Sequence, residues 1–256
     1  MPVARQAPPR NLAPVAQRLR VRYVKEGRLR FSSHRDFQRA FERALRRAEV
    51  PIAFSVGFSP HPKISYANAV PTGVASEAEY LEIGVTQPVD PAQVCAGLDA
   101  ALPPGFGIRE VVVARTPDFM DRLEGSRWRF ELPEVSREAA DRAWATFEGT
   151  ERVEVQRMTK SGQRTLDARA AVVCGAVDDA DACAILTVVS RHGTPSVRPD
   201  DVIAALRLAA DLVLVVPARV TRLAQGPLDS SGTVGDPLAP DRGDASPLGG
   251  PPSASP

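Results

Sequence analysis

The sequence predicts an α+β protein made of two tandem split β-α-β units with antiparallel sheets, placed between two disordered tails. Strand and helix signals follow the order β-α-β-β-α-β twice, over residues 18–115 and again over residues 116–224. The two ends, residues 1–17 and 225–256, are rich in Pro, Gly or Ser and lack apolar periodicity, which is typical of disorder. The hydrophobic fraction of 43% is ordinary for a globular protein.

The first unit opens with LRVRYV (19–24), which alternates apolar and basic residues as a half-buried strand does. An amphipathic helix follows over 35–48. The other elements expected in this unit are strands over 51–56 and 63–68, a strand over 80–85, a helix over 91–102 and a strand over 108–114.

The second unit repeats the order of the first. Its expected elements are a strand over 127–132, a helix over 136–147, strands over 152–158 and 184–190, a helix over 199–210 and a strand over 212–223. Trp128 and Trp144 fall at apolar positions and are expected in the core. Two antiparallel sheets, each with two helices on one face, make both units ferredoxin-like in outline.

Charge is distributed unevenly along the chain, although the net charge is only +1. Residues 1–63 hold 14 Lys and Arg against 4 Asp and Glu, whereas residues 64–256 hold 18 against 27. This asymmetry indicates an anionic partner for the N-terminal region. Because 29 of the 32 basic residues are arginine, part of the excess is also what a GC-rich genome would produce.

The helix over 35–48 is expected to bury one face and to expose a basic one. Its apolar arc consists of Phe37, Ala40, Phe41, Ala44, Leu45 and Ala48, and its basic arc of Arg35, Arg39, Arg43, Arg46 and Arg47. A row of guanidinium groups suits phosphates, so this arc predicts contact with RNA or another phosphate-rich ligand. The alternative is an ordinary solvated helix face.

The start of this helix and the later loop GFSPHPK (57–63) contain the two histidines of the region. Ser33 and Asp36 have the spacing of an N-terminal capping pair, and His34 lies between them. In the loop, prolines flank His61 and restrict its backbone, so the loop is stiff and loses little entropy when it holds a ligand. The alternative reading of the loop is a rigid connection with an exposed histidine.

A recognisable series of residues runs through this region. It comprises Phe31, Ser33, His34, Asp36, Arg43, Ala44, Gly57, Phe58, Pro60, His61, Pro62, Lys63, Gly73, Glu79 and Tyr80. The series resembles the N-terminal region of the radical-SAM-linked protein family. Looser matches to later basic segments of that family are Arg157, Lys160, Asp167, Arg169 and the run Arg198, Pro199, Asp200, so the resemblance covers about residues 18–223.

This family occurs beside, or fused to, cobalamin-binding radical SAM proteins, often near a ribonuclease of the E/G type. The resemblance therefore implies a radical SAM protein as partner and a setting near RNA metabolism. It does not imply radical chemistry in this chain, because a radical SAM enzyme needs three clustered cysteines for its iron–sulfur cluster. Cys95, Cys174 and Cys183 are widely spaced, and we expect no cofactor and no metal.

We therefore expect a non-catalytic accessory partner of a radical SAM enzyme that binds RNA or another phosphate-rich ligand. The expected ligand-binding residues are Arg39, Arg43, Arg46, Arg47, Phe58, His61, Lys63, Tyr80, Arg157 and Arg169, with Tyr66 as a further stacking candidate.

Two alternatives to this function stay open. One is a metal-free RNA endonuclease in which His34 or His61 acts as general acid or base and Lys63 steadies the developing charge. The other is a protein-only interaction scaffold whose arginine face pairs with an acidic patch of the radical SAM protein.

Other classes of protein find little support in the sequence. No apolar stretch approaches the roughly 18 residues that span a bilayer, and the N-terminus lacks a secretory signal, so a cytoplasmic protein without membrane contact is expected. The chain carries no phosphate-binding loop, HExxH or GxSxG motif. His192, in SRHGTPS, is expected to be a turn residue.

Overall fold

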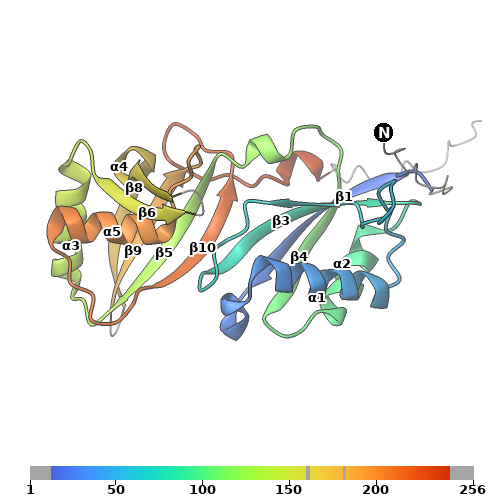
Figure 1. Ribbon diagram of the computed structural model, residues 1–256, viewed down its shortest axis with the longest axis horizontal. Coiled ribbons are helices and arrows are strands. Elements are labelled where there is room, and N and C mark those ends of the chain that lie inside the picture. Colours follow the sequence, from blue (N-terminus) through green and yellow to red (C-terminus); the bar gives the residue numbers. More distant parts are fainter. Residues whose placement is uncertain (1–12, 160–161, 181–182, 243–256) are drawn as a thin grey trace, which may run out of the picture.

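The computed structural model describes residues 13–159, 162–180 and 183–242. Its main feature is a mostly antiparallel sheet with the strand order β4-β1-β3-β10-β5-β9-β8, in which β2 also pairs with β3 (Figure 1). These strands are β1 (Gln17–Lys25), β2 (Ile64–Ala67), β3 (Ala75–Val85), β4 (Phe106–Val113), β5 (Gly125–Pro133), β8 (Val172–Ala180), β9 (Cys183–Arg191) and β10 (Arg219–Gly226). The protein is therefore a mixed α/β structure.

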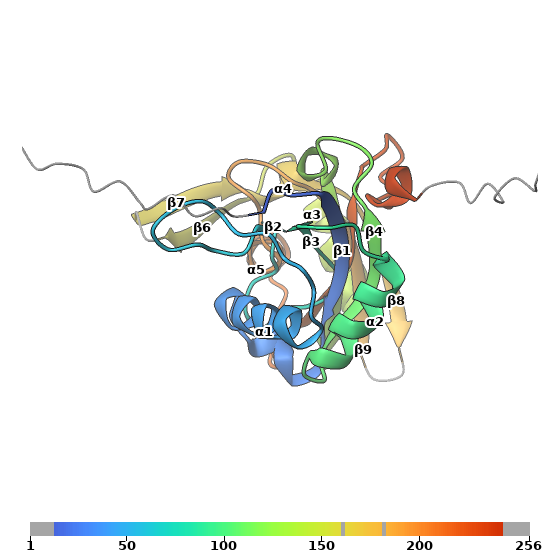
Figure 2. The ribbon, with the colours of Figure 1, turned by 90° about the vertical axis from the view of Figure 1, so that its right-hand side faces the viewer.

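The first half of the sheet carries α1 (His34–Arg47) and α2 (Pro91–Ala101). β1 pairs antiparallel with both β3 and β4. The apolar arc of α1 enters one core with residues of these strands and of α2, and the ring of Phe37 stacks on Tyr23 with centroids 4.0 Å apart. This packing leaves the opposite arc of α1 facing outward (Figure 2).

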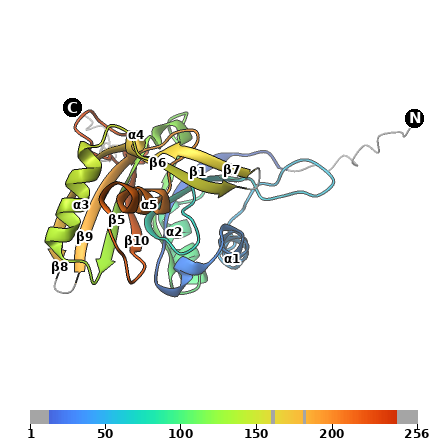
Figure 3. The same cartoon turned by 60° about the vertical axis from the view of Figure 1, so that its left-hand side comes forward.

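The second half of the sheet also carries two long helices, and it contains one insertion. α3 (Arg137–Gly149) and α5 (Pro199–Ala210) share a core with β5, β8 and β9, and Trp128 and Trp144 are both buried there, as predicted. The insertion is a separate hairpin of β6 (Glu154–Thr159) and β7 (Gly162–Asp167), followed by the short helix α4 (Ala168–Ala171). The hairpin projects away from the main sheet (Figure 3).

The two halves join along one edge of β3. β2 pairs with residues 80–83 of β3, whereas β10 pairs in parallel with Ala75 and Ser76 further along the same edge. The chain between β2 and β3, residues 68–74, therefore passes the place where the partner of β3 along this edge changes from β2 to β10. That place is the junction of the two halves.

Several expected strands differ from the structure. Residues 51–56 form isolated bridges, Ile52 with Val85 and Phe54 with Pro62, in place of a regular strand. Residues 212–218 are irregular, and Val215 is 78% exposed, because the last strand begins only at Arg219, after Pro217. Of the strand expected over 152–158, residues 154–158 belong to β6 of the separate hairpin. The strand beside β9 is β8, which was not predicted.

The expected C-terminal tail is also shorter than predicted. β10 continues to Gly226, and the chain then folds back as far as Arg242, with a 3-10 helix over Ala239–Asp241. Leu238 is 0% exposed, and the buried Asp241 pairs with Arg20 of β1. An ion pair leaves no hydrophobic periodicity in the sequence. The composition of residues 225–256 therefore predicted a disordered tail. Residues 243–256 and 1–12 lie outside the described residues.

Within the described part of the chain, no helix has both the length and the apolar character that crossing a membrane requires. The longest of these helices, α1, has 14 residues, and one of its faces carries five arginines.

Candidate functional site

The basic arc of α1 is the most highly charged surface that the sequence predicted. The helix begins as expected, since Asp36 N–H donates to Ser33 Oγ at 3.2 Å and Ser33 N–H donates to Asp36 Oδ2 at 3.1 Å. Its basic residues Arg35, Arg39, Arg43, Arg46 and Arg47 are all exposed. Among the described residues none of them forms an ion pair with a carboxylate. We call these five residues the arginine face.

Asp36 borders the arginine face without forming a described ion pair with any of its five arginines. Asp36 is held by Ser33, and the hydrogen bonds from the side chain and backbone of Ser33 lower the pKa of Asp36 below its ordinary value. Arg47 makes the one described side-chain hydrogen bond of the face, of 3.1 Å from Nη1 to the carbonyl oxygen of Ala101. The other four guanidinium groups are therefore open to a ligand.

The loop around His61 is anchored to β3 and projects from the same side of the sheet as α1 (Figures 2 and 3). Ser55 N–H donates to the carbonyl oxygen of His61 at 2.8 Å, and His61 N–H donates to Ser55 Oγ at 3.0 Å. These bonds brace the loop, while the side chains of Phe58, His61 and Lys63 stay exposed. Phe58 is 60% exposed, which is unusual for a large apolar ring.

His34 and His61 have different surroundings. His34 is half-buried, with Nε2 at 3.1 Å from Nε2 of Gln38 and its ring edge-on to Tyr66 at 4.9 Å. Burial lowers the pKa of His34, and nearby Lys25 lowers it further, against an opposing effect of Glu79. No described hydrogen bond or ring contact joins His34 to His61.

Tyr80, Arg157 and Arg169 are engaged in contacts within the fold. Tyr80 is 2% exposed and packs edge-on against Phe119, so its ring is not available to a base, and burial raises its pKa to about 12. Arg157 pairs with the buried Asp201 at 2.6 Å. Arg169 donates from Nη1 to the carbonyl oxygen of Val172 at 3.0 Å. Tyr66 is half-buried in β2, and Lys160 falls outside the described residues.

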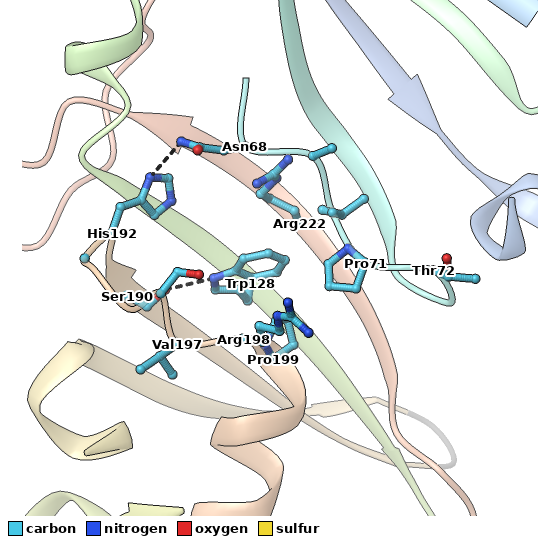
Figure 4. A pocket seen from close by; sticks show the side chains of 14 residues that line it. Asn68, Pro71, Thr72, Trp128, Ser190, His192, Val197, Arg198, Pro199 and Arg222 are labelled. Carbon is cyan, nitrogen blue, oxygen red and sulfur yellow. Dashed lines mark hydrogen bonds between the residues drawn. The ribbon is translucent and has the colours of Figure 1, made fainter. Parts of the chain in front are cut away.

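A pocket of about 480 Å³ opens at the junction of the two halves (Figure 4). Residues 68–72 form one wall, β5, β9 and β10 contribute Trp128, Ser190 and Arg222, and the segment before α5 closes the other side. The described part of the chain contains no cluster of three or more His, Cys, Asp and Glu that could hold a metal. The pocket is within the size range of small-molecule sites. We call it the junction pocket.

His192 lies in the junction pocket, although the sequence suggested only a turn residue. Its Nδ1 is 2.6 Å from the carbonyl oxygen of Leu123, and its Nε2 is 2.8 Å from Ser126 Oγ. A carbonyl only accepts, so Nδ1 carries the proton and Nε2 accepts from the serine hydroxyl. Burial lowers the pKa of His192, which keeps this ring neutral near pH 7. The partners of His192 are a hydroxyl and a backbone carbonyl from residues far away in the sequence, which no local pattern around His192 indicates.

Comparisons with known proteins identify a family. No curated protein matches the chain. An unknown protein from Galdieria sulphuraria has 13% identity over 80% of this chain and 98% of its own, with a TM-score of 0.24. DyPB from Rhodococcus jostii RHA1 has 14% identity over 88% of this chain and 95% of its own, with a TM-score of 0.19. Neither likeness is strong enough to support an argument. Residues 18–199 match the family described as "Uncharacterized protein conserved in bacteria (DUF2344)", and the chain therefore belongs to the DUF2344 family.

Proposed function

We propose that this protein is a non-catalytic accessory partner of a radical SAM enzyme and that it binds RNA through the arginine face of α1. The observation that carries the RNA-binding part is the arginine face itself. Arg35, Arg39, Arg43 and Arg46 are exposed, and none of them forms a described ion pair with a carboxylate. Guanidinium groups spaced along one helix face match the repeated phosphates of a nucleic acid backbone.

Exposed aromatic rings ahead of α1 and in the projecting loop favour RNA over a compact anion. Phe31 immediately precedes the capping segment of α1 and is 67% exposed, and Phe58 of the projecting loop is 60% exposed. Single-stranded RNA is recognised by stacking of unpaired bases on such rings, together with phosphate contacts. Lys63, exposed at the end of the same loop, adds a further cation.

The radical SAM partner rests on the resemblance described above, which covers about residues 18–223. For the fold, we propose that each half is a ferredoxin-like unit. In the first half the strands lie in the order β4-β1-β3-β2, and in the second half in the order β10-β5-β9-β8. When the strands are numbered within each half and the inserted β6–β7 hairpin is left out, both orders read 4-1-3-2, the arrangement that a split β-α-β unit produces.

The experiment that tests RNA binding compares two variants with the same change of charge. In the face variant, Arg35, Arg39, Arg43 and Arg46 are replaced by Gln, which preserves helix propensity. In the control variant, four exposed arginines of the second half are replaced in the same way: Arg142, Arg164, Arg191 and Arg207. Filter binding of a single-stranded RNA is then measured from about 50 to about 500 mM salt.

The face variant should bind weakly, and the slope of log affinity against log salt should fall by about 3, since each lost phosphate contact on a single strand removes about 0.7. The control variant should retain most of the affinity of the wild type. Equal losses in both variants, or wild-type binding that does not respond to salt, would overturn the proposal. Purification with a protein partner and no absorbance from nucleic acid would instead support the scaffold alternative.

The endonuclease alternative gains no specific support from the site. His34 is engaged by Gln38 and Tyr66, and His61 stands in the exposed loop without a described contact to His34. The double variant His34→Ala and His61→Ala provides the direct check. If purified wild type cleaves RNA and this variant does not, the protein is a nuclease and the accessory function is wrong.

A further inference from the structure

The junction pocket is lined by donors of hydrogen bonds and by no described carboxylate. Arg222, Arg198, Asn68 and Ser190 come from four separate segments of the chain and border the same space (Figure 4). Two of them, Arg222 and Ser190, are 2% and 5% exposed. Buried polar groups cost free energy unless they form hydrogen bonds. The donor hydrogens that have no partner in the protein therefore indicate what kind of ligand the pocket would bind.

Arg222 has one terminal nitrogen left over. Its Nη2 donates to Glu79 Oε1 and its Nε lies 3.4 Å from Ser76 Oγ, while Nη1 has no hydrogen-bond partner among the described residues. The guanidinium carbon also lies 5.4 Å from the centre of the Trp128 ring, which fixes its plane. Arg198, on the other side of the pocket, forms no described ion pair through its side chain.

Ser190 and Asn68 also have hydrogens free for a ligand. Ser190 Oγ accepts from Trp128 Nε1 at 2.9 Å, and no described acceptor takes the hydroxyl hydrogen of Ser190. The amide of Asn68 lies 3.3 Å from Nδ1 of His192. Because that nitrogen already carries the proton it donates to Leu123, it cannot accept, and the Asn68 amide hydrogen remains without an acceptor.

The charged groups behind the pocket wall also leave an excess of positive charge. Lys25, Arg30 and Arg222 surround a single carboxylate, that of Glu79, which also accepts from the backbone N–H of Val70 at 3.2 Å. Lys25 is 6% exposed, and its Nζ has one long contact, 3.4 Å to the carbonyl oxygen of Pro71. An anion in the junction pocket would offset this excess of buried positive charge.

The amino-terminal end of α5 borders the pocket but adds little to this field. The Asp201 carboxylate accepts from the backbone N–H of Arg198 at 2.7 Å and pairs with Arg157, so this helix end already has its anion. An anion in the junction pocket would therefore be held by the four side-chain donors and the buried cations.

From these donors we infer that the junction pocket is a binding site for a phosphate monoester. Donors that approach from several walls match the three oxygens of a phosphate better than the two coplanar oxygens of a carboxylate. The volume of about 480 Å³ leaves room for the rest of the molecule against the apolar side chains of Val70, Pro71 and Val197. This site is separate from the arginine face and does not depend on RNA binding.

The test uses the full chain and isothermal titration calorimetry with phenyl phosphate, with benzoate as the carboxylate of similar shape. The main variant is Asn68→Asp, which adds a negative charge at the pocket. Asn68 has a φ of 36°, a left-handed conformation that Asp also tolerates, so the backbone should be unaffected. The matched control is Gln87→Glu, the same change of charge at an exposed position outside the pocket.

Phenyl phosphate should bind with one-to-one stoichiometry and about tenfold or more tighter than benzoate. Asn68→Asp should weaken this binding by about tenfold or more, Ser190→Ala should weaken it severalfold, and Gln87→Glu should leave it unchanged. Absence of binding, equal affinity for benzoate, or equal affinity in Asn68→Asp and the wild type would overturn the inference.

The same preparations separate this inference from the proposed function. The face variant should lose RNA binding and keep phenyl phosphate binding, whereas Asn68→Asp should lose phenyl phosphate binding and keep RNA binding. Loss of RNA affinity in Asn68→Asp equal to that in the face variant would show that the pocket is part of the RNA site and would overturn it as a separate phosphate site.

Discussion

Glu79 of β3 and Arg222 of β10 form a buried ion pair across the junction of the two halves. The strands that carry them share two register pairs, Thr221 with Ala75 and Arg222 with Ser76. Arg30 adds a hydrogen bond of 3.2 Å to the carbonyl oxygen of Val220. With so little backbone pairing at this point, side-chain bonds contribute much of what fixes one half against the other.

Replacing Glu79 with Gln should destabilise the protein strongly. The change leaves the guanidinium of Arg222 buried without its counter-ion, and breaking a buried pair in this way costs about 3–5 kcal/mol. Urea unfolding followed by tryptophan fluorescence measures the loss, since Trp128 lies under Arg222. The matched control is Asp141→Asn, which breaks the exposed pair with Arg137 and should cost less than about 1 kcal/mol. Similar costs for the two variants would contradict the prediction.

Asp241 should make the stability of the protein sensitive to acid. Burial alone would raise the pKa of Asp241, but hydrogen bonds from Thr116, from the backbone N–H of Arg115 and from Arg20 override it and hold this pKa well below its ordinary value. A carboxyl whose folded pKa is depressed stabilises the fold above its unfolded pKa of about 4, and this stabilisation is lost as the pH falls toward the folded value.

The acid effect can be measured as the free energy of unfolding from about pH 7 down to about pH 3. Below about pH 4 the curve of the wild type should fall more steeply than that of Asp241→Asn. At pH 7 the variant should already be less stable, because it leaves the buried Arg20 without this counter-ion. Parallel curves in acid would mean that Asp241 is not the group responsible.

His192 should add a second pH dependence, nearer neutrality. Its folded pKa is lowered by burial, so the unfolded state binds a proton first as the pH falls below about 6.5. Stability is therefore complete above that pH and decreases as the pH falls toward the folded pKa. Replacement by Gln, which cannot titrate, should flatten the decline between about pH 7 and about pH 5. His34 also has a lowered pKa and remains in both proteins, so the difference between the two curves isolates His192.

The first half was easier to predict than the second for physical reasons. The apolar arc of α1 and the capping pair of Ser33 and Asp36 are local patterns, with partners three or four residues apart. β8 was missed because VVCGAVDDA carries a glycine and two aspartates and belongs to an edge strand, which shows weak alternation. As a result, the predicted strand order had the segment of β6 at the position that β8 occupies in the structure.

The junction pocket could not be predicted from local patterns at all. Asn68, Ser190 and Arg222 are far apart in the sequence, and they meet because β2 and β10 occupy the same edge of β3. The sequence did place the arginine face, since all of its members lie on one helix. The prediction for Tyr80 failed for the opposite reason. Its side chain lies on a face of the sheet that the segment around Phe119 covers. The residues next to Tyr80 in the sequence do not indicate this long-range contact.

Gly175 of β8 lies directly beneath the ring of Trp144 in α3. A Cβ at this position would be 2.5 Å from Trp144 Cζ2 and 2.8 Å from the carbonyl oxygen of Thr187. Both neighbours are held in place, because Trp144 is buried in the second core and Thr187 is paired within the sheet. The replacement Gly175→Ala should therefore force α3 away from the sheet and cost about 1–3 kcal/mol.

Chemical denaturation of Gly175→Ala measures this cost, and Gly149→Ala is its control. A Cβ at Gly149 meets nothing within 4 Å, and the position is the last of α3, so alanine there should be neutral or stabilise by up to about 1 kcal/mol. Adding Trp144→Phe to Gly175→Ala should recover part of the loss, because the smaller ring vacates the space that the new methyl group needs. If the second replacement only adds its own cost, the steric contact between α3 and β8 is not the cause.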